Sequence, residues 1–306
     1  MTAHHPHVIT LLTDFGNQDA YVGIMKGVIA GINPFANIID ICHNIPPQDI
    51  FQAAYLLYTS YKYFPKKTIH VAVVDPGVGS KREIVCVETQ DYLFLTPNNG
   101  LLSFIIQEEK PKCIIRVTDD KYFLPSPSST FHGRDIFAPV AARLSLGIKP
   151  QQLGPKINQL DQLEIPKPEY KKTGQLEGQI IYIDRFGNLV TNITRGYIEQ
   201  HIGNQTQNRG QGSGVRGRKL EVRGRTPGTL KKTPKKSLLL YNTVETTIGR
   251  KKIIGLSKTY MDVKAGDPLV LFGSAGFLEV SINQGNAQKY FRVDRGNKIR
   301  VEMGSY

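Results

Sequence analysis

The first 150 residues alternate short apolar runs with stretches of helical spacing, and this alternation constrains the fold more than any other feature. Apolar runs at residues 7–12, 38–41 and 69–74 are typical of buried strands, and residues 21–32 and 49–63 have apolar side chains at helical spacing. The same alternation continues with strand-like runs at 83–88, 92–96 and 113–117 and helical stretches at 100–108 and 135–146. This pattern predicts an α/β domain, a mainly parallel sheet sandwiched between helices.

The second half of the chain has a different pattern. Short strand-like runs separated by Gly and Asn turns are typical of a small β-barrel or sandwich; they lie at residues 179–183, 189–193, 238–241, 252–256, 269–272 and 278–282. The stretch 149–173, rich in Pro, Gln and Lys, has the composition of a linker. We therefore predict an N-terminal α/β domain (1–150), a linker (151–175) and a C-terminal β domain (176–306).

The positive charge of the chain is local. The net charge is +13, but residues 204–236 alone hold ten Lys and Arg against one Glu, which leaves +4 for the rest of the chain. A basic excess first suggests a nucleic-acid partner. This segment, however, contains no aromatic side chain on which a base stacks, so we expect a flexible basic insertion and no nucleic-acid partner.

Bulk features exclude other classes of protein. No apolar run approaches the roughly 20 residues of a membrane-spanning helix, and the first residues do not resemble a secretory signal. Cys42, Cys86 and Cys113 are scattered and odd in number, which favours buried thiols over disulfides or a zinc site. We expect a cytoplasmic protein.

Two carboxylates follow apolar strands directly. Asp14 stands in the sequence TDFG and Asp75 in VVDPGVGS. An Asp beside Gly is often only a turn former. Because ligands collect at the carboxyl ends of parallel strands, however, both residues are predicted to face one crevice. Asp135 opens a helical stretch, and an N-cap is the simplest interpretation of it.

A charged group after a buried strand needs a partner, and Arg82 lies seven residues beyond Asp75 across a Gly-rich loop. Such a pair would keep Asp75 ionised. His132 stands next to Gly133, which we expect to leave space for a small molecule to approach the ring. A lone His in a loop is more often structural, so a catalytic role for His132 depends on its neighbours.

Other motifs are weak. The short paired spacings of metal ligands are absent, as is a phosphate-binding Walker loop, and DPGVGS lacks the glycine order of a dinucleotide-binding loop. We therefore expect neither a metal nor a cofactor. The turns at 183–188 and 283–287 are rich in amides and carboxylates, which serve turn formation or recognition of a polar heterocycle.

The motifs taken together, in their order along the chain, indicate a protein family, which no single motif does. The ordered set TDFGNQDAYVGIMKG, VVDPGVG, PNNGLLS, FHGRDIFAPVAA, YIDRFGNLVTNI and GSAGFLEVSINQGNA resembles the S-adenosyl-L-methionine (SAM) hydrolase family, also called SAM hydroxide adenosyltransferases, which is related to fluorinase and chlorinase. The resemblance covers about residues 7–295, apart from 204–236. It implies an α/β domain followed by a β-barrel domain, and a homotrimer with sites shared between subunits. The implied reaction converts SAM and water into adenosine and L-methionine without a cofactor.

The resemblance also implies roles for individual residues. Asp75, Arg82 and His132 would handle the attacking water, with either Asp75 or His132 as the base. Asp14 would accept hydrogen bonds from both ribose hydroxyls. Contacts to the other parts of SAM would come from Asp19 and Asp184 (methionine ammonium), Ser274 (methionine carboxylate), Asn188 (adenosine) and Asn283 (adenine edge).

Three positions differ from the halogenating relatives. These enzymes carry Tyr in place of Asp75, and fluorinase has Ser in place of Gly133, so both differences favour water over a halide. Fluorinase also has an Arg where this chain has Ala275, which weakens the expected contact to the methionine carboxylate. A SAM-dependent halogenase and a non-catalytic adenosine-, SAM- or RNA-binding protein remain the alternatives.

Overall fold

The computed structural model describes residues 8–172, 174–199 and 243–303, and the chain divides between Ile165 and Pro166 into two compact units. The predicted basic insertion (204–236) and the predicted strand at 238–241 lie outside the described residues. Each unit is described by itself.

The first unit is built on a seven-stranded sheet with the order β2-β1-β3-β5-β4-β6-β7. Its strands are β1 (Val8–Thr13), β2 (Asn37–Cys42), β3 (Ile69–Val73), β4 (Ile84–Glu88), β5 (Leu93–Pro97), β6 (Cys113–Arg116) and β7 (Lys156–Ile157). Strands β2, β1, β3 and β5 pair in parallel, and the antiparallel pairs involve β4 and β7. The mainly parallel sheet predicted from the sequence is confirmed.

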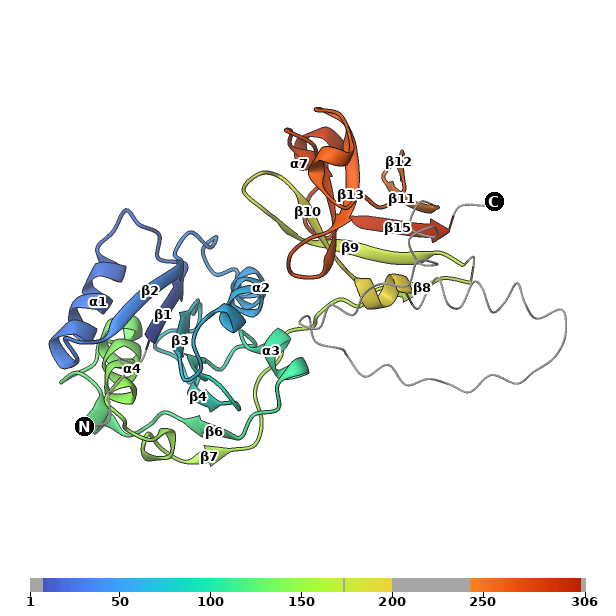
Figure 1. Ribbon diagram of the computed structural model, residues 1–306. Coiled ribbons are helices and arrows are strands. Elements are labelled where there is room, and N and C mark those ends of the chain that lie inside the picture. The colour runs from blue at the N-terminus through green and yellow to red at the C-terminus, as the bar shows by residue number, and fades with distance from the viewer. Residues whose placement is uncertain (1–7, 173, 200–242, 304–306) are drawn as a thin grey trace, which may run out of the picture. The chain divides into compact units, whose positions relative to one another are not determined.

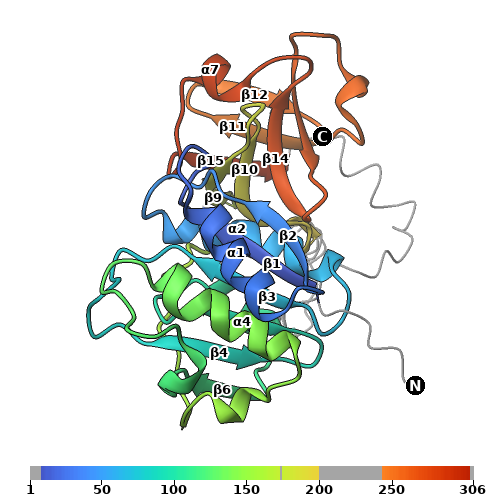
Figure 2. The ribbon, with the colours of Figure 1, turned by 90° about the vertical axis from the view of Figure 1, so that its left-hand side faces the viewer.

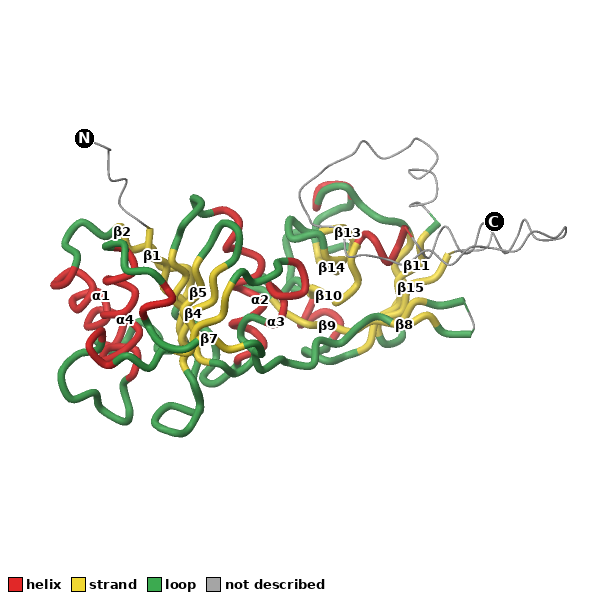
Figure 3. The backbone as a smooth tube through the Cα atoms, turned by 90° about the horizontal axis from the view of Figure 1, so that it is seen from below, coloured by secondary structure: helices red, strands yellow, loops and turns green. Residues whose placement is uncertain are grey.

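Helices cover both faces of this sheet, as Figures 1 and 3 show. The helices are α1 (Tyr21–Ile32), α2 (Ile50–Ser60), α3 (Ser103–Glu108) and α4 (Ala138–Ser145). Figure 2 views the unit from the side of α1 and α4, which lie in front of the strands. Helices α2 and α3 pack on the opposite face.

The alternation of side chains along each strand builds a separate core on each face. In β1, Ile9 and Leu11 pack in the core with α1 and α4, whereas Leu12 packs in the core with α2 and α3. Both cores are apolar, so the central strands are buried on both sides, and this explains why they appear in the sequence as continuous apolar runs.

Local signals in the sequence set the helix limits in this unit. Helix α1 has the predicted limits, and the Asp49 carboxylate caps α2 by accepting the Gln52 N–H at 2.9 Å. The predicted helix over 135–146 is instead a π-helical turn, η3 (Gly133–Phe137), followed by α4.

The second unit is an antiparallel β structure. Its main sheet has the order β12-β11-β15-β9-β10-β14-β13, and β8 pairs with β9. The strands are β8 (Glu169–Tyr170), β9 (Leu176–Ile183), β10 (Leu189–Thr194), β11 (Val244–Ile248), β12 (Lys251–Ile254), β13 (Pro268–Phe272), β14 (Phe277–Ile282) and β15 (Lys298–Met303), with a short helix α7 (Ala287–Phe291) after β14.

The two end strands of this order approach each other. Just beyond β12, the Ser257 N–H donates to the Val270 carbonyl of β13 at 2.7 Å, which nearly closes the sheet into a barrel. Inward-facing residues such as Leu176, Val244 and Ile299 fill its interior. The predicted combination of an α/β domain and a small β-barrel domain is confirmed.

No helix in the described part of the chain is long and apolar enough to span a membrane.

Candidate active site

The parallel strands of the first unit bring several polar side chains to one edge of the sheet. In the pairing of β1 with β3, Thr13 lies opposite Val73, so Asp14 and Asp75 leave the sheet from neighbouring strands. His43 follows β2, and Asn99 follows β5, at the same edge. Asp14 and Asp75 therefore lie at the same edge of the sheet, and the crevice that they are predicted to share stays a prediction.

Asp75 and Arg82 form a nearly buried ion pair. The Arg82 Nε–H donates to Asp75 Oδ1 at 2.8 Å, and Arg82 Nη2 donates to Asp75 Oδ2. Only 5% of the Asp75 side chain and 9% of the Arg82 side chain are exposed. Burial and bidentate geometry distinguish this contact from a surface ion pair.

Asn99 connects a second loop to the same strand end. Its Nδ2 donates to the Val74 carbonyl, next to Asp75, at 2.9 Å, while its buried Oδ1 has no hydrogen-bond partner among the described residues. The sequence PNNG indicated only a turn, so sequence reasoning missed this contact.

His132 is positioned by the loop before it and by the π-helical turn after it. We predicted Asp135 as an N-cap, and this is wrong. Asp135 lies inside η3, where its carboxylate accepts the Ser128 N–H at 2.8 Å and the Arg134 Nε–H at 2.6 Å. Because Asp135 reaches back across the turn, it fixes the loop 128–131 that leads into His132.

The loops carrying Asp75 and His132 touch each other. Gly79 has a positive φ of 77°, and a Cβ at this position would lie 2.3 Å from the Ser129 carbonyl oxygen, so only glycine fits. Gly133 does not leave the space that we expected beside His132. A Cβ there would lie 3.1 to 3.2 Å from Phe131, Met25 and Phe15, so protein side chains occupy that space.

His132 lies within electrostatic reach of the ion pair. Burial lowers the pKa of its imidazole below the ordinary value, and the Arg82 charge lowers this pKa further, against smaller opposite effects of Asp75 and Asp135. The imidazole is therefore neutral at pH 7 and has a ring nitrogen able to accept a proton. Its Nδ1 is buried without a hydrogen-bond partner in the part of the chain that is described.

Asp14 and Asp19 both lie in the loop between β1 and α1. The Gln48 N–H donates to Asp14 Oδ2 at 2.8 Å and orients the carboxylate, and no other described residue bonds to this group. Asp19 is exposed just before α1. Their assignments to the ribose and to the methionine ammonium stay predictions.

Sequence reasoning missed a chain of contacts that supports the Asp14 loop. Thr13 Oγ1 lies 2.8 Å from His43 Nδ1, and His43 Nε2 lies 3.1 Å from Asp40 Oδ1. Asp40 in turn pairs with Lys26 at 2.6 Å, and the His43 carbonyl accepts the Gly16 N–H. Thr13 and Gly16, on the two sides of Asp14, are thereby both bonded to His43, directly after β2. Only the parallel pairing of β1 with β2 reveals this contact.

In the second unit, Asp184 and Asn188 contact each other in the turn between β9 and β10. Asp184 Oδ1 accepts the backbone N–H groups of Phe186 and Asn188, and Asp184 Oδ2 accepts Asn188 Nδ2 at 2.8 Å. The turn-forming role that we weighed against substrate recognition is therefore present. Phe186, at the tip, is 74% exposed and does not belong to a core.

Ser274 and Asn283 lie at opposite ends of β14, Ser274 before the strand and Asn283 directly after it. Ser274 is exposed in the turn 273–276, whereas Asn283 is buried and its Nδ2 donates to the Val263 carbonyl at 2.8 Å. Sequence reasoning missed Glu279, a buried carboxylate whose Oε1 accepts the hydroxyls of Tyr260 and Ser281. A Cβ on Gly273 would lie 2.8 Å from Glu279 Oε2, so this carboxylate approaches the Ser274 turn.

No described His, Cys, Asp or Glu side chains form a group of three that could hold a metal ion. The chemistry open to the first unit is that of a carboxylate, a guanidinium and a neutral imidazole.

Comparison with known families matches each unit to a domain of the same family. Residues 9–154 match the SAM hydroxide adenosyltransferase N-terminal domain, and residues 178–226 and 227–300 match the SAM hydroxide adenosyltransferase C-terminal domain.

Individual relatives cover nearly the whole chain. The chain is 35% identical over 305 residues to an (R)-S-adenosyl-L-methionine hydrolase of Methanocaldococcus jannaschii, covering 96% of this chain and 95% of that protein. A fluorinase of an Actinoplanes species is 28% identical, with 68% of this chain and 78% of the fluorinase covered. A Thermotoga maritima crystal structure described as an uncharacterized conserved protein has a TM-score of 0.80 and 32% identity, covering 96% of this chain and 99% of that one.

The contact between the Asp75 and His132 loops can be tested on the folded protein. Gly79→Ala is expected to lower the free energy of unfolding by about 1 to 3 kcal/mol, because the new Cβ collides with the Ser129 carbonyl and the backbone at this position is left-handed. Urea denaturation measures the change. Gly77→Ala is the matched control, because its Cβ would lie 3.4 Å from its nearest neighbours. Equal stability of the two variants would show that the loops do not touch.

Proposed function

The chain belongs to the SAM hydroxide adenosyltransferase family, and we propose that it hydrolyses SAM to adenosine and L-methionine. Full-length similarity to a curated SAM hydrolase supports the reaction. The observation within the structure that carries the proposal is the nearly buried Asp75–Arg82 pair with His132, whose pKa is lowered, within its electrostatic reach. These are the groups needed to place and deprotonate a water without a metal.

The leaving group of this reaction needs no catalytic assistance from the protein. The sulfonium of SAM leaves as neutral methionine, so no acid has to protonate it. The enzyme must hold a water in line with the ribose C5′ and take its proton as the C5′–O bond forms and the C5′–S bond breaks.

We assign to His132, rather than to Asp75, the role of the base that takes the proton of the attacking water. Both oxygens of Asp75 already accept hydrogen bonds from Arg82, which leaves this carboxylate suited to orient the water. The lowered pKa of His132 keeps the imidazole neutral and ready to accept a proton near pH 7. The anionic Asp75 also opposes entry of a halide, which disfavours the halogenase alternative.

The remaining residues would bind the substrate. Asp14, with one oxygen oriented by Gln48, is suited to a vicinal diol, and Asp19 and Asp184 supply negative charge for the ammonium. Asn188, Ser274 and Asn283 complete the proposed set. We further propose a homotrimer with shared sites, as the family resemblance implies, in the cytoplasm, where the three free thiols stay reduced.

The reaction is tested by incubating the purified full-length protein with SAM and without added metal. Adenosine and methionine should accumulate in equal amounts. Asp75→Asn should lower kcat by about 10²- to 10⁴-fold, because the water is no longer held by an anion. Asp120→Asn, an isosteric change at an exposed position, is the matched control and should leave kcat unchanged.

Thermal unfolding of the Asp75→Asn variant checks that the loss of activity is not a loss of fold. Full activity of folded Asp75→Asn would contradict the proposal. The same incubation with chloride should yield no 5′-chloro-5′-deoxyadenosine, and its formation would establish the halogenase alternative.

The pH profile tests the assignment of the base. A general base works in its deprotonated form, so kcat/KM should fall as the pH drops through the pKa of His132. Because that pKa is lowered, the midpoint should lie below 6.5. His132→Gln should remove this acid limb together with most of the activity. An acid limb that persists in His132→Gln would transfer the role of base to Asp75.

A further inference from the structure

The second unit contains a cavity that shares no residue with the proposed active site. Its volume is about 370 Å³, and it lies between the end of β11, the end of α7 and the start of β15. Thr247, Phe291, Arg292, Asn297, Lys298 and Arg300 are among the residues that line it.

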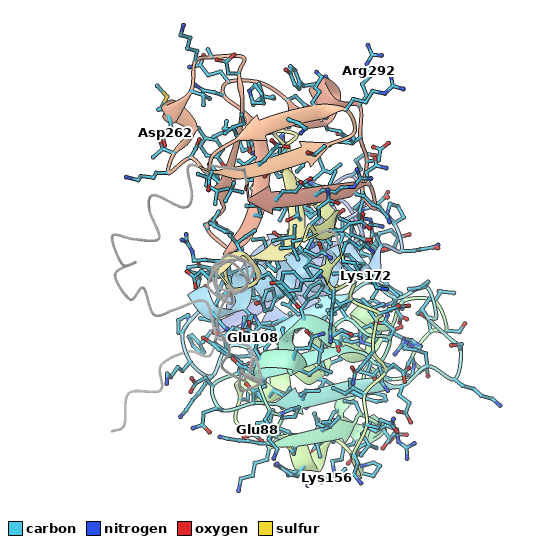
Figure 4. All side chains as sticks on the ribbon, turned by 90° about the vertical axis from the view of Figure 1, so that its right-hand side faces the viewer. Glu88, Glu108, Lys156, Lys172, Asp262 and Arg292 are labelled. Carbon is cyan, nitrogen blue, oxygen red and sulfur yellow. The ribbon has the colours of Figure 1, made fainter. Side chains whose placement is uncertain are left out.

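The lining is strongly positive. Three of the lining side chains, those of Arg292, Lys298 and Arg300, are cations, and no carboxylate lines the cavity. Lys298 and Arg300 alternate with the buried Ile299 on β15, so both point to the same outer face of the sheet. Arg292 approaches from the end of α7, where Figure 4 labels it.

The nearest acid to the β15 cations does not cancel their charge. Glu177 on β9 lies 2.7 Å from Lys298 Nζ and 3.6 Å from Arg300 Nε, and it also lies 3.5 Å from Lys171 Nζ. Glu177 is therefore shared among three cations, and Lys171 also pairs with Glu169 at 2.7 Å. Glu177 restricts the two β15 side chains without neutralising the cavity, and Arg292 adds a further positive charge.

The neutral polar groups of the cavity offer donors. Asn297 Oδ1 accepts the Asp294 N–H at 2.7 Å, so the acceptor side of this amide is already used and its NH₂ group remains. The Thr247 hydroxyl lies opposite Arg300 in the pairing of β11 with β15 and is able to donate. A ring of cations and donors selects for an anion with several acceptor oxygens.

We propose that this cavity binds a small phosphomonoester whose organic part packs against Phe291. Two guanidinium groups match the geometry of phosphate oxygens, and Phe291 supplies an apolar wall. The volume lies near the lower limit for small-molecule sites, and the cavity is partly open, so that its exposed Arg292, Lys298 and Arg300 side chains are accessible to a ligand. This site does not depend on the proposed hydrolysis.

Phenyl phosphate is the probe, titrated calorimetrically into the full-length protein. It should bind more tightly than inorganic phosphate, while phenol should not bind measurably. Binding should weaken as salt is raised. Arg292→Gln should lower the affinity about tenfold, and Arg292→Gln combined with Arg300→Gln should abolish binding.

Lys289→Gln is the matched control, because Lys289 lies on the same helix and does not line the cavity. It should leave the affinity unchanged, and hydrolysis of SAM should be equal in all variants, which separates this proposal from the previous one. Absence of phenyl phosphate binding would overturn the proposal, as would an equal loss in Lys289→Gln. Binding of single-stranded RNA that depends on Arg292, without phenyl phosphate binding, would identify a nucleic-acid surface instead.

Discussion

The parallel pairing of β2, β1, β3 and β5 is the constraint on which the proposed chemistry depends. Because parallel strands end at the same edge, this pairing places His43, Asp14, Asp75 and Asn99 side by side although they are far apart in sequence. Two apolar cores, one on each face of the sheet, hold the strands in register. A shift in register would separate the Asp14 loop from His43 and the Asp75 loop from Asn99.

The charged side chains of Asp75 and Arg82 are nearly buried at this edge of the sheet. The Asp75 carboxylate would be costly to bury alone, and Arg82 provides both opposite charge and two hydrogen bonds. Gly79 allows the loop between these residues to approach Ser129, and Asp135 fixes the segment that leads to His132. The loop that carries Asp75 and Arg82 and the segment that leads to His132 are thus held together by backbone contacts that need these particular residues.

The sequence predicted the first unit well because its central strands are continuous apolar runs and its helices have clear limits, as at Tyr21–Ile32. It did not reveal β11 or β15, whose alternating sequences VETTI and KIRVEM contain few apolar residues and depend on pairing with neighbouring strands. The Asp75–Arg82 pair was predictable because both residues lie in one loop. The Thr13–His43–Asp40 contacts were not, since they join two strands through ordinary residues. Asp135 and Gly133 were misjudged because an Asp near a helix start and a Gly beside a His each have several structural uses.

The position of the water oxygen in the products tests directly whether water attacks C5′ of SAM. Hydrolysis in water enriched in ¹⁸O, followed by mass spectrometry of both products, shows which bond the water forms. Attack on C5′ predicts one ¹⁸O atom in the 5′-hydroxyl of adenosine and none in methionine. Adenosine without ¹⁸O would contradict the account, because the oxygen at C5′ would then not come from the water that Asp75 and His132 are proposed to hold.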